Sequence, residues 1–177
     1  MPRFDSQLRA VALWDETWCL RLNRASSVLW IRALFHAVSR LGDGVFWYVL
    51  MGGILLADGS AAAGPVLRMV AVGTAGLALY KWLKKRTSRP RPYQVRVAIR
   101  PGADPLDQFS FPSGHTLHAV AFSVLLTACH PPLAWLAWPF ALLVAASRVV
   151  LGLHYPTDVL AGAAIGAALA FAALALA

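Results

Sequence analysis

Charge is scarce in this chain of 177 residues. Only 14% of the residues are Asp, Glu, Lys or Arg, whereas 59% are hydrophobic and the mean hydropathy is +0.61. A soluble domain of this size needs a more polar surface, so the composition excludes that class of protein. The chain is predicted to be an integral membrane protein.

Acidic residues are scarcer still. Asp and Glu number 8 against 16 Lys and Arg, which gives a formal net charge of +8 and a pI near 10.3. This balance predicts anionic partners, either lipid headgroups or a phosphorylated substrate. Nucleic acid is not expected as a partner, because no nucleic-acid-binding motif accompanies the charge.

Cysteine is nearly absent. Cys19 and Cys129 lie far apart, and neither has a second cysteine nearby. The pattern therefore indicates no disulfide, no zinc site and no redox pair. The first residues are basic but contain no continuous apolar core before a cleavage site, so we expect no removable signal peptide.

Two long stretches, 116–147 and 159–177, contain no Asp, Glu, Lys or Arg. The first is long enough for two membrane crossings of ~20 residues each. His-Pro-Pro at 130–132 interrupts it, which predicts a helical hairpin. In the second stretch, Gly162 and Gly166 have the four-residue spacing that lets membrane helices approach closely.

The first half of the chain is less uniform. Residues 44–57 and 65–83 are apolar enough for two more spans, although the first must borrow flanking residues. Residues 1–43 mix six arginines with tryptophan and leucine, which is typical of helices that lie in the membrane interface. A distorted sixth span is the alternative. We predict one all-α domain, residues 1–177, built as a polytopic membrane bundle of five to six transmembrane helices.

Polar side chains gather in the stretch SRVVLGLHYPTD, which begins at Ser147. Pro156 suits the first turn of a helix, and Asp158 then falls in that turn, where the helix dipole favours a carboxylate. This carboxylate can reach the ring of His154, fix its tautomer and leave the other nitrogen free to attack. Arg148 and Ser147 can hold an anion beside it. An N-capping cluster with a snorkelling arginine is the alternative.

A second polar motif, FPSGHT, opens one of the uncharged runs. Ser113 is a suitable N-cap, and Gly114 lets an anion approach the free N–H groups of the first helical turn. His115, beside that anion, is placed to protonate a leaving oxygen. A capped helix with an incidental histidine is the alternative. His118 lies one turn further on, but without a carboxylate or thiol in this helix the pair does not predict a metal site.

Six cations crowd into the stretch KWLKKRTSRPRP, which begins at Lys81. A juxtamembrane stop that binds anionic lipid is one interpretation. Pro90 and Pro92 stiffen the backbone around Arg91, however, which indicates a fixed position for that side chain. Counting the crossings puts all three polar stretches on the same face of the membrane. We therefore predict that they converge at one site.

Taken together, these residues resemble the signature of a known family. The pattern reads Lys84 with Arg91-Pro92, then Pro112-Ser113-Gly114-His115, then Ser147-Arg148 with His154 and Asp158. It resembles the type-2 phosphatidic acid phosphatase family, which includes lipid phosphatases, bacterial acid phosphatases and vanadium haloperoxidases. The short chain with its amphipathic beginning is similar to small bacterial members that dephosphorylate undecaprenyl diphosphate.

The resemblance implies a mechanism that needs no metal or cofactor and passes through a phosphohistidine. It makes His154 the nucleophile, Asp158 its orienting partner and His115 the acid for the leaving group. The residues that it implies for binding the phosphoryl oxygens are Lys84, Arg91, Ser113, Gly114 and Arg148. The residues that it implies in support are Pro92, Pro112 and Ser147.

We therefore expect a membrane lipid phosphatase that converts undecaprenyl diphosphate to undecaprenyl phosphate, with a lipid phosphate and the bilayer as its partners. Phosphatidate, phosphatidylglycerophosphate and a lipid A phosphate are alternative substrates. A lipid phosphotransferase and a non-catalytic protein that binds anionic lipid are alternative functions. The positive-inside rule puts the basic face in the cytoplasm, whereas the resemblance puts the site on the extracytoplasmic side of the inner (plasma) membrane. We follow the resemblance, because the cations of residues 81–91 have a site to serve.

Overall fold

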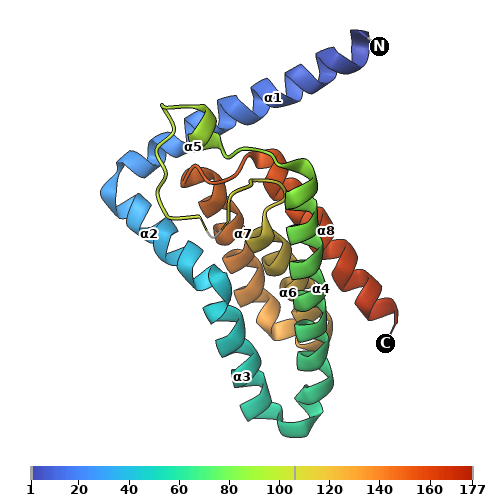
Figure 1. Ribbon diagram of the computed structural model, residues 1–177. Helices are drawn as coiled ribbons and strands as arrows, with labels where there is room; N and C mark the ends of the chain where they lie inside the picture. The colour runs from blue at the N-terminus through green and yellow to red at the C-terminus, as the bar shows by residue number, and fades with distance from the viewer. Residues whose placement is uncertain (1, 106, 177) are drawn as a thin grey trace.

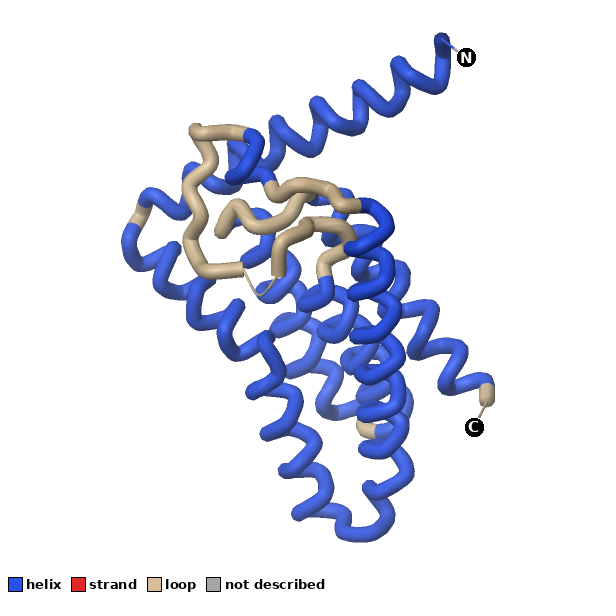
Figure 2. The backbone as a smooth tube through the Cα atoms, in the orientation of Figure 1, coloured by secondary structure: helices blue, strands red, loops and turns tan. Residues whose placement is uncertain are grey.

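The protein is an all-α bundle in the computed structural model, which describes residues 2–105 and 107–176 (Figure 1). Within those residues the chain forms no strand, and its loops gather mainly at one end of the bundle (Figure 2). The helices are α1 (Pro2–Asn23), α2 (Leu29–Arg40), α3 (Phe46–Asp58), α4 (Ala63–Thr87), α5 (Pro92–Val95), α6 (Gly114–Cys129), α7 (Ala134–Val150) and α8 (Pro156–Ala175).

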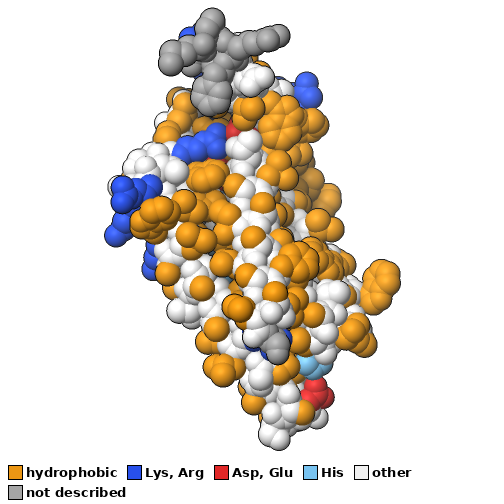
Figure 3. Space-filling model, turned by 90° about the vertical axis from the view of Figure 1, so that its right-hand side faces the viewer, with side chains coloured by type: hydrophobic (Ala, Val, Ile, Leu, Met, Phe, Trp, Pro, Cys, Tyr) orange, Lys and Arg blue, Asp and Glu red, His pale blue; other side chains and the backbone are white. Residues whose placement is uncertain are grey.

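Three stretches of helix in the described chain are long and apolar enough to cross a membrane. They are Leu29–Val95, Pro131–Val150 and Pro156–Ala175, and α6 is a shorter apolar helix. The first stretch is itself a hairpin, because α4 runs back beside α3 after the turn at Gly59–Ala62 (Figure 1). Hydrophobic side chains cover most of the face in Figure 3. The prediction of a polytopic membrane bundle is confirmed.

The predicted turns and helix starts fall where the sequence puts them. The break at residues 130–132 separates α6 from α7, and α8 begins at Pro156. The structure differs at the predicted boundary between residues 43 and 44. There α2 continues into α3 through a π-helical turn, Leu41–Val45, in which Gly44 has a φ of +133°. Because this φ is not helical, Gly44 puts a kink between the two helices.

The helix α2 therefore leads into α3 and packs along α7 rather than lying apart from the bundle. A buried hydrogen bond of 2.5 Å from Arg148 Nη1 to Ser39 Oγ joins the two helices. Sequence reasoning kept residues 1–43 apart from the spans because six arginines are mixed with their apolar residues. Two of the six, Arg32 and Arg40, lie in α2. Both arginines lie on its exposed face, so they leave the packed face uninterrupted.

Two glycines of α8 bring it against α6. A Cβ on Gly166 would overlap with the carbonyl oxygen of Leu117, and one on Gly162 would overlap with the carbonyl oxygen of Ser113. The predicted close approach at this four-residue spacing is confirmed. Because Ser113 caps α6, this packing also fixes where the FPSGHT motif sits.

Replacing Gly166 with alanine is expected to destabilise the protein by about 2 kcal/mol, because the new methyl group meets rigid backbone rather than a flexible side chain. Thermal unfolding of the purified protein in detergent measures the effect. Gly53→Ala is the matched control: Gly53 also lies inside an apolar helix, but a Cβ there meets nothing within 4 Å. Equal melting temperatures for the two variants would contradict this account of the packing.

Candidate active site

A cavity of about 270 Å³ lies at the loop end of the bundle and reaches between α3 and α4. Six of the eight residues predicted for catalysis and phosphate binding line it: Lys84, Arg91, Gly114, His115, Arg148 and His154. The apolar part of the wall includes Trp47, Met51, Val70, Leu77 and Phe122. The cavity therefore joins a cationic end to an apolar channel.

His154 sits on the loop that joins α7 to α8 and is 1% exposed. Gly152, with a φ of +70°, turns this loop, and the backbone N–H of His154 donates to the carbonyl of Arg148 at 3.0 Å. On one side of the ring, Nε2 lies 3.3 Å from Arg91 Nη1. On the other side, Nδ1 lies 3.7 Å from Asp158 Oδ2 and has no hydrogen-bond partner in the described chain.

The predicted pairing of Asp158 with His154 is thus a close approach of 3.7 Å rather than a hydrogen bond in this structure. Burial lowers the pKa of His154 well below its usual value, and the cationic side chains of Arg148 and Arg91 lower it further. The ring is therefore uncharged at neutral pH. A neutral imidazole keeps a lone pair with which it can attack an electrophile.

Three buried cations surround this ring, and a buried cation is costly unless a partner offsets its charge. Lys84 Nζ donates to Phe109 O at 2.9 Å, and Arg91 Nη1 donates to Leu153 O at 2.7 Å. Arg148 is 2% exposed, and its Nε has no hydrogen-bond partner among the described residues. The cationic end of the cavity is therefore suited to an anion.

A carboxylate already occupies part of this end. Asp107 Oδ1 accepts hydrogen bonds from Lys84 Nζ at 2.7 Å and from Arg91 Nη2 at 2.8 Å. Burial would raise the pKa of Asp107, but the hydrogen bond from Lys84 and the nearby charges lower it below its usual value. This oxygen sits where two donors converge, as an oxygen of a bound anion would.

Replacing Asp107 with asparagine is expected to tighten the binding of inorganic phosphate about fivefold, because it removes a charge that competes with the anion for Lys84 and Arg91. Isothermal titration calorimetry in detergent measures this affinity. Asp104→Asn, on an exposed position of the same loop, is the matched control. Weaker phosphate binding by Asp107→Asn would show instead that the carboxylate holds the cations in place.

The FPSGHT motif begins α6 as predicted. Ser113 Oγ accepts from Thr116 N at 3.4 Å, which confirms its role as the N-cap. A Cβ on Gly114 would come within 3.0 Å of the ring of Tyr80, so glycine is needed there for packing. His115 lies in the first turn, and its Nε2 contacts Asp43 Oδ1 of the π-helical turn. Asp43 was not found from the sequence, because it lies 72 residues away.

Three residues predicted in support, Ser147, Pro92 and Pro112, do not line the cavity. Ser147 is buried, and its hydroxyl donates to the carbonyl of Val144 in its own helix at 2.6 Å. The expectation that Ser147 helps to hold an anion stays a prediction. Pro92 instead begins the short helix α5, and Pro112 follows a cis peptide bond just before Ser113.

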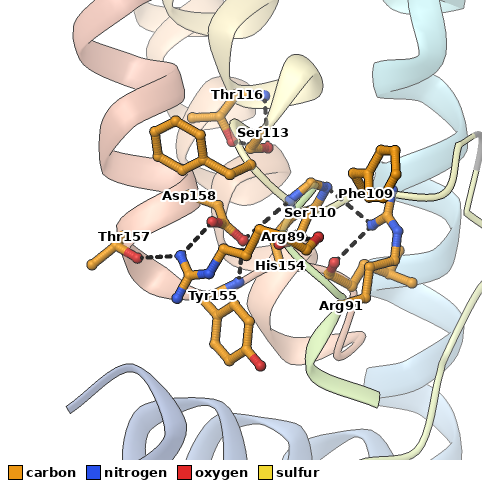
Figure 4. Close-up of polar contacts among 12 residues, drawn as sticks. Arg89, Arg91, Phe109, Ser110, Ser113, Thr116, His154, Tyr155, Thr157 and Asp158 are labelled. Atoms are coloured by element: carbon orange, nitrogen blue, oxygen red, sulfur yellow. Dashed lines mark hydrogen bonds and ion pairs between the residues drawn. The ribbon is translucent and has the colours of Figure 1, made fainter. Parts of the chain in front are cut away.

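The strongest connection missed from the sequence is made by Arg89 (Figure 4). Its Nη1 donates to Asp158 Oδ1 at 2.7 Å and to Thr157 Oγ1 at 2.8 Å. Its Nη2 donates to Asp15 Oδ2 of α1 at 2.7 Å. In the sequence, Arg89 was one cation among six in a basic run, and nothing local distinguished it.

The three polar stretches predicted to converge supply the cationic and histidine side chains that line one cavity. Residues 65–177 match the model of the PAP2 superfamily. The chain belongs to the PAP2 superfamily. The matched region contains Lys84, Arg91, His115, Arg148 and His154, whereas α1 to α3 lie outside it.

Individual PAP2 relatives share part of the chain. A decaprenylphosphoryl-5-phosphoribose phosphatase of Mycolicibacterium smegmatis is 37% identical over 118 residues, which cover 63% of this chain and 62% of that protein. The undecaprenyl-diphosphatase BcrC of Bacillus subtilis is 33% identical over 102 residues, which cover 56% of this chain and 51% of that protein. The chain therefore spans between one half and two thirds of these relatives.

Solved structures share nearly the whole fold. The crystal structure of a transmembrane PAP2-type phosphatidylglycerolphosphate phosphatase from Bacillus subtilis has a TM-score of 0.75 and 28% identity, covering 94% of this chain and 86% of that one. The crystal structure of Aquifex aeolicus LpxE has a TM-score of 0.76 over 88% of this chain and 92% of that one. At 24% identity, this second likeness concerns the fold.

Proposed function

We propose that this protein is a membrane lipid phosphatase that hydrolyses undecaprenyl diphosphate to undecaprenyl phosphate. The observation that carries the proposal is the cavity itself. One end holds His154 Nε2 beside the buried cations of Lys84, Arg91 and Arg148, and the other end is an apolar channel between α3 and α4. The cationic end suits a phosphate group, and the apolar channel suits a hydrocarbon chain.

In the proposed reaction, His154 Nε2 attacks the terminal phosphorus, and a phosphohistidine forms as the bond to the bridging oxygen breaks. His115 gives a proton to that oxygen, and undecaprenyl phosphate leaves. Water then gives a proton to His115 as its oxygen attacks the phosphohistidine, the N–P bond breaks, and inorganic phosphate is released. The three buried cations stabilise the charge on the phosphoryl oxygens, which is the part that a metal ion plays in other phosphoryl-transfer enzymes. The proposed mechanism therefore needs no metal.

The substrate is proposed from two kinds of support. The lining residues Trp47, Met51 and Leu77 suit a long hydrocarbon chain. The names of two relatives specify polyprenyl lipids, an undecaprenyl diphosphate in one and a decaprenylphosphoryl phosphoribose in the other. The second relative is the more similar of the two, so a phosphoribosyl polyprenyl lipid is the second candidate substrate.

Phosphate release by the purified protein in detergent, with EDTA present, tests the proposal. The substrates to compare are undecaprenyl diphosphate, decaprenylphosphoryl-5-phosphoribose, phosphatidate and phosphatidylglycerophosphate. Fastest release from undecaprenyl diphosphate is expected. Fastest release from the phosphoribosyl lipid would support the second candidate. Release from none of the four by well-folded protein would contradict the phosphatase and favour a protein that only binds anionic lipid.

We also propose that the site faces the extracytoplasmic side of the plasma membrane, as the family resemblance implies. Cys129 ends α6 at the far end of the bundle from the site, whereas Asp104 is exposed on a loop beside it. A cysteine introduced at position 104 in a Cys129→Ser background is expected to react with a membrane-impermeant thiol reagent in intact cells. Reaction with permeant reagents alone would reverse the orientation.

A further inference from the structure

One face of α1 is fastened to the loop that carries His154. The polar residues Asp15, Cys19 and Asn23 follow one another at intervals of four, so they share a face of the helix. Cys19 Sγ donates to the carbonyl of His154 at 3.5 Å, and Asn23 Nδ2 donates to the carbonyl of Val150 at 2.9 Å. The helix thus braces the catalytic loop on both sides of the histidine.

Asp15 makes the most elaborate of these contacts. Its side chain is fully buried, with 0% of its surface exposed. It accepts hydrogen bonds from Thr157 N at 2.9 Å, from Thr157 Oγ1 at 2.5 Å and from Arg89 Nη2 at 2.7 Å. Three donors therefore converge on one buried carboxyl group, which holds this side chain and its partners firmly in place.

The contacts of Arg89 extend this connection to the nucleophile. The same guanidinium binds Asp15 through Nη2 and Asp158 through Nη1, and the ring of Tyr155 lies 4.1 Å below it. Asp158 also accepts from Tyr155 N at 2.8 Å, so both of its oxygens have donors. Asp158 Oδ2 then faces Nδ1 of His154.

The formal charges of the cluster formed by Asp15, Asp158 and Arg89 do not cancel. By formal charge, Asp15 and Asp158 contribute two negative charges and Arg89 contributes one positive charge. Burial raises the pKa of the neighbouring Cys19 thiol to about 12, so that group stays neutral. One negative charge is therefore left over beside Nδ1 of a histidine that is uncharged in the empty site. The cluster becomes neutral when the imidazole gains a positive charge.

We propose that Asp15 and Arg89 are positioning residues for phosphoryl transfer at His154, acting through Asp158. Arg89 fixes the Asp158 carboxylate against the ring, and Asp15 supplies the negative charge that balances the imidazolium as the N–P bond forms. This inference rests on the proposed function. It adds to the family pattern, because Asp15 lies outside the matched residues 65–177 and Arg89 lies between two motif positions.

Kinetics of Asp15→Asn test the inference. Asparagine keeps the shape and an oxygen that can accept from Thr157 N, but it removes the charge. We expect kcat for phosphate release to fall about 10- to 100-fold, with KM within about threefold of the wild-type value, because the charge acts on the transition state rather than on bound substrate. Inhibition by orthovanadate, a transition-state analogue, should weaken in parallel, whereas inhibition by inorganic phosphate should not.

Glu16→Gln is the matched control, because Glu16 is the next residue of α1 and pairs with the exposed Arg96 instead. It should leave kcat unchanged. Arg89→Lys provides a second variant if Asp15→Asn fails to fold: lysine keeps one charge but cannot bridge two carboxylates with a planar fork, so kcat should again fall.

The outcomes separate this inference from the proposed function. A kcat for well-folded Asp15→Asn within about twofold of the wild-type value would overturn the inference and leave the function standing. A loss that appears equally in phosphate and vanadate inhibition would show that Asp15 only maintains the fold of the site. Absence of phosphate release by the wild-type protein would overturn the proposed function itself.

Discussion

Replacing His154 with alanine is expected to lower kcat for phosphate release by at least about 10⁴-fold, because the proposed mechanism forms the N–P bond at this ring. The buried ring presents Nε2 to the cationic end of the cavity, and its uncharged state makes that nitrogen a nucleophile. Release of inorganic phosphate from undecaprenyl diphosphate measures the effect.

The same variant should keep its affinity for inorganic phosphate, because Lys84, Arg91 and Arg148 remain in place. Titration calorimetry with phosphate therefore distinguishes lost chemistry from lost binding. His130→Ala is the matched control, since His130 pairs with Asp58 at the opposite end of the bundle. If His154→Ala retained more than about one hundredth of the wild-type kcat, His154 would not be the nucleophile.

Replacing His115 with alanine is expected to lower kcat by about 10²- to 10⁴-fold on a substrate with a poor leaving group, because the leaving oxygen then departs without a proton. The contact of His115 Nε2 with Asp43 places a carboxylate where it stabilises the protonated ring. Phosphate release from phosphatidate, whose leaving group is an alcohol, should show the full loss.

A change of leaving group tests this role directly. A nitrophenyl phosphate releases a stable phenolate that needs no proton, so its hydrolysis should fall much less in His115→Ala. His154→Ala should abolish both reactions, because the nucleophile is needed whatever leaves. An equal loss on both substrates in His115→Ala would contradict the assignment of His115 as the acid and indicate a role in binding phosphate.

The sequence alone determined the features that arise from local patterns. Long runs without charge predicted the apolar spans, and Pro156 and Ser113 predicted the starts of α8 and α6. These elements follow from the cost of burying charge in a bilayer, from the missing N–H of proline and from the free N–H groups of a helix start. The motifs that contain Lys84, His115 and His154 also pointed to the family from the sequence alone. Each motif is short, and the three follow one another along the chain in the order of the family pattern.

The tertiary structure decided which side chains meet across the fold. Asp43 reaches His115 over 72 residues, Asp107 reaches Lys84 over 23, and Asp15 reaches Thr157 over 142. Each of these carboxylates looked like an isolated charge in the sequence, because a partner at that distance leaves no periodic or local pattern. Only the packed bundle brings the partners together, and it does so because buried charges must be paired once the helices exclude water.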